Sequence, residues 1–310
     1  MDTQSITAQI DGLTIALCTR NRITELRRCL ASICVAQNQT TFTFLELLIV
    51  DDGLITHDQL DEFARLFNKS RFRFVYFNKS IEPGLFKSRI AAINHASGEV
   101  ILFLDDDVEI SRDYITLLGG GYLKFQNVAG IGGVDILLNT TRGRQFIKRL
   151  FMIDSGNPSK LSFSGYNHSQ ESWVEQNNPF ISEYLSGCNM SYKKAAVAKC
   201  IVYLPWLNGY SLGEDLALSH FARQRGNLWV DPQLHVLHHH TPKSRDNPLE
   251  VALSSITNHY QLLKLYRSPL MRYIALGWTI FGLVTTSLIK MSSRKLKVYL
   301  RYIISYLCRR

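Results

Sequence analysis

Three consecutive carboxylates, Asp105, Asp106 and Asp107, follow the apolar run Val100–Leu104. Neighbouring carboxylates repel one another, so such a cluster costs stability unless a cation or hydrogen-bond donors offset its charge. Mg²⁺ and Mn²⁺ prefer carboxylate oxygens and keep coordination positions open for phosphate oxygens. One aspartate could therefore ligate a metal ion while another binds a ribose hydroxyl. The same acids would also suit the N-terminus of a following helix.

A second acidic turn, Asp51-Asp52-Gly53, ends the apolar run Phe44–Val50. Taken alone, this sequence is typical of an ordinary turn. Together with the triple aspartate it becomes informative, because one acid could bind a pyrimidine or a ribose while a metal ion holds a diphosphate.

Polar and basic side chains are expected beside these acids. Arg20 and Asn21 directly follow the first apolar run, Leu13–Cys18, and Arg89 belongs to the helical pattern before Val100. Arg89 fits equally well as a solvated charge on the surface of its helix.

Two further motifs could supply a base and a metal ligand. Glu214 and Asp215 follow Gly213 and open a helical pattern, where they either compensate the helix dipole or provide a general base. His238-His239-His240 follows a strand-like run. Side chains alternate along a strand, so either His238 and His240 or His239 alone can face a site. A polar strand end explains the histidines as well.

The elements that must position these residues alternate along the first 135 residues. Strands are predicted at Leu13–Cys18, Phe44–Val50, Phe72–Phe77 and Val100–Leu104, and helices from about Thr24, at Gln59–Phe67 and at Leu85–Ala96. This order predicts an α/β fold with a mostly parallel sheet covered by helices on both faces. Ligands bind at the carboxyl ends of such strands, where the acidic clusters lie.

The remainder of the chain is less regular. Residues 139–180 show little periodicity and are expected to form a functional loop or lid, in which Tyr166 and Trp173 could shape the acceptor site. Helical patterns return at Lys193–Cys200 and Gly213–Arg225, and a strand-like run at Leu234–Leu237.

Charge is divided unevenly along the 310 residues. The formal net charge is +9, yet residues 1–242 carry a net charge of −1 and residues 243–310 one of +10. The basic C-terminal part also holds the longest apolar run, which favours an anionic membrane surface as partner and gives no indication of a nucleic-acid partner. The six cysteines form no CxxC pair, and the N-terminus lacks the features of a signal peptide, so we expect a location at the cytoplasmic face of the membrane.

The C-terminal part is expected to be helical and membrane-associated. A helix is predicted at about Pro248–Tyr266, followed by Tyr273–Ile289, which contains no charged residue, and by the basic amphipathic segment Leu296–Leu307. A helix of this apolar length measures about 25 Å, against roughly 30 Å for the hydrocarbon core of a bilayer. One C-terminal span is therefore marginal, and a helix lying in the membrane plane is equally compatible. A buried core helix is a third interpretation.

Five segments resemble, in order, the motifs of the inverting family 2 glycosyltransferases, nucleotide-sugar enzymes with the GT-A fold. These segments are ALCTRNR, LLIVDDG, FKSRIAAINHASGEVILFLDDDVEI, SGCNMSYKK and GYSLGEDLALSHFARQRG. The resemblance predicts a GT-A catalytic domain over residues 1–245, followed by the helical membrane-association region 246–310.

The resemblance also implies roles for individual residues. Asp215, with Glu214 beside it, is implied as the catalytic base, and Asp105, Asp107 and His238 as ligands of Mg²⁺ or Mn²⁺. The residues implied in nucleotide-sugar binding are Thr19, Arg20, Asn21, Asp51, Asp52, Arg89, Asp105 and Asp106. Gly187 and Asn189 are implied on the acceptor side, where Trp206 is placed by its position in the chain.

Two departures from the family pattern matter. Cys18 stands where proline is commoner, and the QxxRW signature of processive synthases is absent. We therefore expect one sugar to be transferred per encounter, from a nucleotide-diphosphate sugar to a glycan or lipid-linked saccharide used in surface polysaccharide synthesis.

Three alternatives were weighed against a glycosyltransferase. A sugar-nucleotide pyrophosphorylase would need a glycine-rich basic loop after the first strand, where this chain has Thr19-Arg20-Asn21-Arg22. A Rossmann dehydrogenase is disfavoured because no GxGxxG follows that strand. A non-catalytic, membrane-associated sensor or scaffold for sugar nucleotides stays open.

Overall fold

The computed structural model describes residues 9–36, 41–67, 70–79, 83–138, 141–198, 204–209, 211–240 and 248–289. Within these ranges the strands are β1 (Leu13–Thr19), β2 (Leu45–Asp51), β3 (Phe72–Asn78), β4 (Val100–Asp105), β5 (Val108–Ile110), β6 (Val128–Asp135), β7 (Phe180–Ser182), β8 (Asn189–Lys193) and β9 (Asn227–His238). They form one sheet with the order β3-β2-β1-β4-β8-β6-β9-β5, and β7 pairs with β9.

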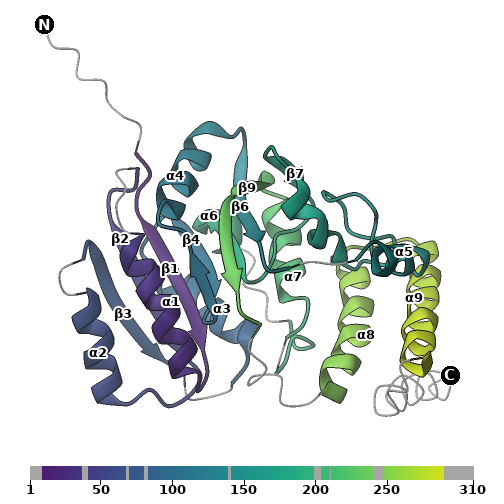
Figure 1. Ribbon diagram of the computed structural model, residues 1–310, viewed down its shortest axis with the longest axis horizontal. Coiled ribbons are helices and arrows are strands. Elements are labelled where there is room, and N and C mark those ends of the chain that lie inside the picture. The colour runs from purple at the N-terminus through teal and green to yellow at the C-terminus, as the bar shows by residue number, and fades with distance from the viewer. Residues whose placement is uncertain are drawn as a thin grey trace, which may run out of the picture.

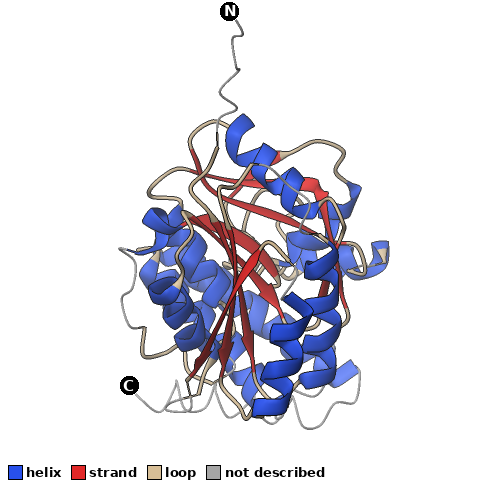
Figure 2. Cartoon of the chain, turned by 90° about the vertical axis from the view of Figure 1, so that its left-hand side faces the viewer, coloured by secondary structure: helices blue, strands red, loops and turns tan. Residues whose placement is uncertain are grey.

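Helices lie on both sides of this sheet (Figure 2). They are α1 (Ile23–Val35), α2 (His57–Phe67), α3 (Leu85–His95), α4 (Tyr114–Lys124), α5 (Arg142–Leu150), α6 (Lys194–Ala198), α7 (Glu214–Ala222), α8 (Pro248–Leu265) and α9 (Leu270–Ile289), with a 3₁₀ helix, η1, at His168–Glu175. Figure 1 places α5, α8 and α9 at the end of the molecule opposite α2 and β3.

The N-terminal half is a parallel α/β unit, as the sequence predicts. β1 pairs in parallel with both β2 and β4, and β2 with β3. Side chains alternate across the sheet, so Ile15 and Leu102 join the apolar cluster that includes α1, while Ala16 and Ile101 join the cluster that includes α3. The four predicted strands and three predicted helices of this half are confirmed within one or two residues.

The sheet as a whole is mixed, which differs from the mostly parallel sheet expected. β8 runs antiparallel to β4 and β6, and β5 and β7 run antiparallel to β9. The sequence analysis did not identify β6 or β8, because β6 carries the glycine-rich stretch Gly130–Gly133 and β8 reads Asn-Met-Ser-Tyr-Lys. Neither run has the apolar density of the N-terminal strands.

Residues 139–180 contain more regular structure than expected. α5 and η1 both lie inside this stretch. α5 was missed because its polar and basic residues outnumber its apolar ones, and it buries none of its side chains completely.

Helix α8 packs against the body of the molecule. Asn258 Nδ2 donates to the Leu212 carbonyl at 2.8 Å, and Leu262 belongs to the same buried cluster as the core of α7. The boundary expected between residues 245 and 246 lies in 241–247, outside the described residues, as does Leu296–Leu307. Among the helices that the structure describes, none has the length and apolarity needed to cross a bilayer.

Gly133 and Gly120 differ in the space that is available for a side chain. A Cβ at Gly133 in β6 would lie 2.0 Å from the Leu234 carbonyl oxygen, whereas one at Gly120 in α4 would meet nothing within 4 Å. We expect Gly133→Ala to destabilise the fold by about 1–3 kcal/mol through overpacking. Gly120→Ala should stabilise it by about 0.5–1 kcal/mol, because alanine loses less backbone entropy in a helix. Urea unfolding of the two variants measures both changes in the free energy of unfolding. Changes of equal size and sign in the two variants would contradict the close packing of β6 on β9.

Candidate active site

The candidate site lies at the carboxyl edge of the parallel strands. Sheet order reverses between β1 and β4, so the chain leaves these neighbouring strands toward different parts of the sheet, which opens a crevice at their ends. The strand register pairs Cys18 with Asp105 and Thr19 with Asp51. The two acidic turns found in the sequence therefore flank the same strand end.

Arg22 offsets the charge of the aspartate cluster. Its guanidinium lies 2.7 Å from Asp106 Oδ1 and 2.6 Å from Asp107 Oδ2, and Thr19 Oγ1 donates to Asp106 Oδ2 at 2.7 Å. Burial raises the pKa of Asp106 to about 7, although Arg22 and Thr19 both act to lower it. Arg22 was not predicted, because its only signal in the sequence is that of a basic residue close behind the first strand.

Asp105, Asp107 and His238 form the first of two clusters that could hold a metal ion. Their ligand atoms lie within 4.8 Å of one another, with His238 Nε2 3.2 Å from Asp107 Oδ1 and 3.9 Å from Asp105 Oδ2. Burial acts to lower the pKa of His238, but the bond to Asp107 and the charge of Asp105 help to raise it to about 11. Two carboxylate oxygens with one imidazole suit Mn²⁺ or Mg²⁺, provided that the imidazole gives up its proton to the solvent. The residues present therefore fit such an ion.

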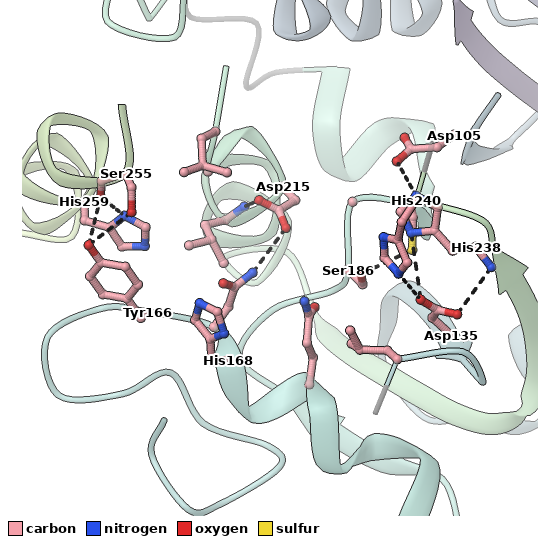
Figure 3. Close-up of a pocket in the computed structure, with 18 of the residues that line it drawn as sticks. Asp105, Asp135, Tyr166, His168, Ser186, Asp215, His238, His240, Ser255 and His259 are labelled. Atoms are coloured by element: carbon pink, nitrogen blue, oxygen red, sulfur yellow. Dashed lines mark hydrogen bonds and ion pairs between the residues drawn. The ribbon is translucent and has the colours of Figure 1, made fainter. Parts of the chain in front are cut away.

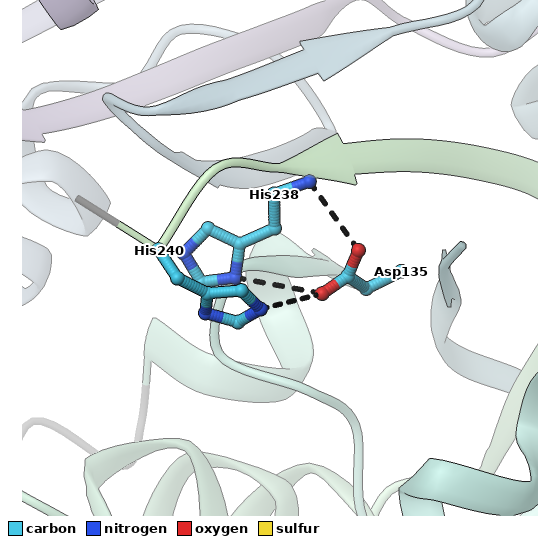
Figure 4. Close-up of side chains that lie close together, drawn as sticks. All are labelled: Asp135, His238 and His240. Atoms are coloured by element: carbon cyan, nitrogen blue, oxygen red, sulfur yellow. Dashed lines mark hydrogen bonds and ion pairs between the residues drawn. The ribbon is translucent and has the colours of Figure 1, made fainter. Parts of the chain in front are cut away.

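The second cluster shares His238 and adds Asp135 and His240 (Figure 4). Asp135 Oδ2 lies 3.1 Å from His240 Nε2 and 3.8 Å from His238 Nδ1. His239 points elsewhere and contacts Glu109 at 2.6 Å, which confirms the alternation expected for the three histidines. His240 was predicted only as an alternative, together with His238. Asp135 was not predicted, although it ends a strand as the other acids do.

Arg89 is a buried connector and not a solvated helix charge. Only 2% of its side chain is exposed, and its guanidinium contacts Glu214 Oε2 at 2.6 Å, Asp105 Oδ1 at 3.2 Å and the Gly187 carbonyl at 2.8 Å. Burial raises the pKa of Glu214 to about 8 against the opposing charge of Arg89. Glu214 is thus engaged by Arg89 in the interior.

Asp215 follows Glu214 in the first turn of α7 and lines the cavity. Its Oδ1 accepts from the Leu216 amide at 2.9 Å, and its Oδ2 accepts from Asn167 Nδ2 at 3.4 Å. Burial raises the pKa of this carboxyl above its usual range, with Arg89 opposing the shift. A carboxylate of raised pKa is a stronger base.

One cavity of about 330 Å³ joins these groups. Asp105, His238 and His240 line one end of it, Asp215 lies between, and Tyr166, Ser255 and His259 line the other end (Figure 3). The far end is made by α8 and by the loop before η1. Sequence reasoning did not predict Ser255 or His259, since an isolated histidine in a helix carries no recognisable signal.

His259 is held in a fixed orientation at that far end. Its Nδ1 lies 2.6 Å from the Ser255 carbonyl, and its ring stacks on Tyr166 with centroids 3.6 Å apart and planes inclined by 7°. Burial lowers the pKa of His259 to about 4, and the charge of His168 acts in the same direction. The imidazole is therefore neutral at pH 7.

The carboxylate oxygens of the acidic turn at the end of β2 accept hydrogen bonds and ion pairs from within the protein. Asp51 is fully buried and accepts from the amides of Gly53 and Ile55 at 2.7 and 3.0 Å and from the Tyr76 hydroxyl at 2.9 Å. Asp52 accepts from Lys79 Nζ and the Gly84 amide, both at 2.7 Å. Their nucleotide-binding role stays a prediction.

The other predicted residues divide by position. Asn21 Oδ1 accepts from the Leu54 amide at 3.1 Å, which ties the ends of β1 and β2 together, and Arg20 is exposed beside it. Gly187 lines the cavity. The structure does not bring Asn189 or Trp206 there: Asn189 is fully buried and bonded to the Tyr114 hydroxyl, and Trp206 packs against the core.

Comparisons with known proteins identify sequences that are similar to this chain. Residues 14–158 match the model of the family Glycosyl transferase family 2. An N-acetylglucosaminyltransferase of Bradyrhizobium sp. (strain ANU 289) is 35% identical over 94 residues, which cover 30% of this chain and 58% of that protein. Glycosyltransferase GlyA of Streptococcus pneumoniae serotype 4 is 29% identical over 122 residues, 39% of this chain and 16% of that protein. The chain thus spans less than two thirds of either relative.

Solved structures show the fold. A mannosyltransferase from Pyrobaculum calidifontis, solved with GDP-Man and Mn²⁺, superimposes with a TM-score of 0.57 at 14% identity, covering 97% of this chain and 81% of that one. Residues 1–349 of S. aureus TarS give a TM-score of 0.51 at 14% identity, covering 96% and 92%. The arrangement of nine strands and flanking helices in the described residues is the GT-A fold.

The neutral, buried state of His259 makes stability depend on pH. Because its folded pKa of about 4 lies below its unfolded value, the unfolded chain binds the extra proton first as the pH falls. The stabilisation is complete above about pH 6.5 and is lost as the pH falls toward 4. Between pH 7.5 and 5, wild type should lose about 2 kcal/mol more stability than His259→Gln. Urea unfolding at the two pH values measures this difference, and parallel losses would contradict it.

Proposed function

We propose that this member of glycosyltransferase family 2 transfers one sugar, with inversion, from a nucleotide-diphosphate sugar to a hydroxyl of a glycan or lipid-linked saccharide. The observation that carries the proposal is the shared cavity, in which Asp215 faces the same space as Asp105 and His238. A base and a site for a divalent ion are the two groups that such a displacement needs.

The donor would bind at the strand edge. Asp105, Asp107 and His238 are the residues that would hold Mg²⁺ or Mn²⁺, and the ion would neutralise the negative charge that develops on the leaving diphosphate. Thr19 and Arg22 fix Asp106 and Asp107, so the carboxylates are oriented before the donor arrives. Arg89 holds Asp105 in the same way.

Asp215 would accept the proton of the attacking hydroxyl. The acceptor oxygen bonds to the anomeric carbon while the bond from that carbon to the diphosphate oxygen breaks, and attack from the opposite face inverts the centre. Asn167 and the Leu216 amide hold both carboxylate oxygens of Asp215, and burial strengthens it as a base. Glu214 contributes by holding Arg89 in place.

A surface made by α5 and α9 supports the expected membrane partner. The residues of α9 that face outward are apolar and follow helical spacing: Leu270, Met271, Ile274, Trp278 and Phe281 are 42–73% exposed. Exposed Phe146, Ile147 and Leu150 of α5 lie beside them, joined by the Trp278 indole, which donates to the Leu150 carbonyl at 2.8 Å.

Basic side chains accompany this apolar face, which we call the α5/α9 surface. Arg142 and Arg144 are exposed on α5. An apolar helix face with adjacent cations suits the interface of an anionic bilayer, in which both helices lie in the membrane plane. We propose that the enzyme docks through the α5/α9 surface at the cytoplasmic face and meets there a lipid-linked acceptor of surface polysaccharide synthesis.

We expect Asp215→Asn to retain metal-dependent donor binding and to lower turnover by roughly 10²–10⁴-fold, the usual contribution of a general base. Release of nucleoside diphosphate from a panel of nucleotide sugars, with Mn²⁺, Mg²⁺ or EDTA, measures turnover, and calorimetry measures binding. Asp61→Asn on exposed α2 is the matched control. Full turnover in Asp215→Asn would exclude Asp215 as the base. Donor binding without turnover in the wild-type protein would favour a sensor of sugar nucleotides.

Replacing three exposed residues of the α5/α9 surface tests membrane docking. Phe146, Leu270 and Ile274 are 57–73% exposed, so their change to serine should leave the fold intact. We expect the triple variant to lose at least tenfold in binding to phosphatidylglycerol-containing vesicles in sedimentation. Leu54→Ser is the control, since Leu54 is 82% exposed on the β2 side of the molecule. Equal vesicle binding by the triple variant and wild type would refute this surface as the docking site.

A further inference from the structure

The far end of the cavity contains a buried hydrogen-bond acceptor with nothing to bind. His259 is 3% exposed, lines the cavity, and its Nε2 has no hydrogen-bond partner among the described residues. The Ser255 carbonyl can only accept, so the proton of the imidazole sits on Nδ1, 2.6 Å away. Nε2 consequently presents a lone pair.

A buried acceptor without a partner costs about 1–3 kcal/mol, so native structures rarely retain one without a use. Among the residues that the structure describes at this end of the cavity, none supplies a donor to His259 Nε2. Tyr166 directs its hydroxyl to the Ser255 carbonyl at 3.0 Å, and its ring lies flat against the His259 ring. Figure 3 shows these three side chains grouped together, across the cavity from His238 and Asp135.

The chemistry of this end selects a particular kind of ligand. The lone pair of Nε2 requires an O–H or N–H donor. Among the residues that line the cavity, Arg89 comes from α3, Asp105 and Asp135 end β4 and β6, and Asp215 lies in the first turn of α7. His238 and His240 lie at the strand edge and His168 begins η1, whereas α8 contributes the neutral Ser255 and His259. Burial keeps the imidazole uncharged, which disfavours a phosphate here. A neutral, hydroxyl-rich ligand meets all of these conditions.

We propose that Tyr166, Ser255 and His259 form the subsite for the acceptor sugar, in which His259 Nε2 accepts a hydrogen bond from a hydroxyl that does not react. The inference rests on the proposed function, because Asp215 lies between this end and the strand edge and so faces the hydroxyl that would attack (Figure 3). The rigid stack of Tyr166 on His259 gives the ring of the acceptor a preformed wall.

The subsite is built from parts of the chain outside the matched family segment. The family model ends at residue 158, whereas Tyr166 precedes η1 and both Ser255 and His259 belong to α8. Asp215 and His238 also lie beyond residue 158, so it is the cavity that separates the subsite from the strand edge, with Asp215 between them. In this proposal the three residues contribute to the choice of acceptor.

The test uses the full chain and a panel of neutral methyl glycosides as probes. Glycoside binding is measured by ligand-observed saturation-transfer NMR in a buffer without Mn²⁺. Binding of a nucleoside diphosphate is then measured on the same samples with Mg²⁺. We expect at least one glycoside to bind wild type. His259→Phe, which keeps the ring but removes the lone pair, should weaken that binding about tenfold, the effect of one lost hydrogen bond. His259→Gln, which restores an acceptor, should recover part of it.

Matched variants and the second ligand separate the outcomes. His235→Phe makes the same substitution at a histidine of β9 whose side chain is exposed, and this variant should bind the glycoside as wild type does. If no glycoside binds wild type, or if His259→Phe binds as tightly as wild type, the subsite is refuted while nucleotide binding and metal-dependent turnover still support the proposed function. If His259→Phe fails to fold, the wild-type ¹⁵N shift of His259 Nε2 on glycoside addition decides, and an unchanged shift overturns the proposal. Failure of nucleoside diphosphate binding in wild type would instead count against the proposed function.

Discussion

The ion pairs of the buried Arg89 guanidinium hold together the two halves of the site. Arg89 comes from α3 in the parallel half, and it contacts Asp105 at the end of β4, Glu214 at the start of α7 and the Gly187 carbonyl before β8. A guanidinium at 2% exposure is tolerated because its N–H groups meet two carboxylates and a carbonyl, while its face lies over the Phe103 ring. Its removal would leave Glu214 buried without its partner, so the positions of the proposed base and of the proposed metal-binding acids depend on the same cation.

The strand edge shows how a dense set of acids can be kept in place. Arg22 forms an ion pair with one carboxylate oxygen of Asp106 and one of Asp107, and His238 lies near the other oxygen of Asp107. Asp105 is the member left partly open, with 29% of its side chain exposed toward the cavity. The arrangement leaves Asp105 accessible while Arg22 and His238 hold Asp106 and Asp107, which would prepare these acids for the divalent ion that we propose.

Much of the fold was predictable, and the site only in part. The strands of the parallel half are dense apolar runs, and their ends carry acids, so Asp105 and Asp107 could be placed at one edge from the sequence. Asp215 and His238 were assigned to the same site only through the resemblance to the family. Arg22, Asp135 and His259 could not be placed, because their roles depend on distances between elements far apart in the chain. Asn189 shows the reverse: its motif suggested the acceptor side, but a sheet position with alternating side chains turns it toward Tyr114 in the interior.

The position of Tyr166 links the cavity to helix α9. Its hydroxyl and ring stand at the end of the cavity, while its other contacts place it in the apolar cluster with Leu263 of α8 and Leu276 of α9. The exposed stripe of α9 lies on the opposite side of that helix, about 10 Å away, one helix diameter. With a bilayer on that stripe, the end of the cavity at Tyr166 would lie about one helix diameter from the lipid, and the strand edge would lie at its other end. Supply of a lipid-linked acceptor would then follow its lateral diffusion in the membrane and not its concentration in water.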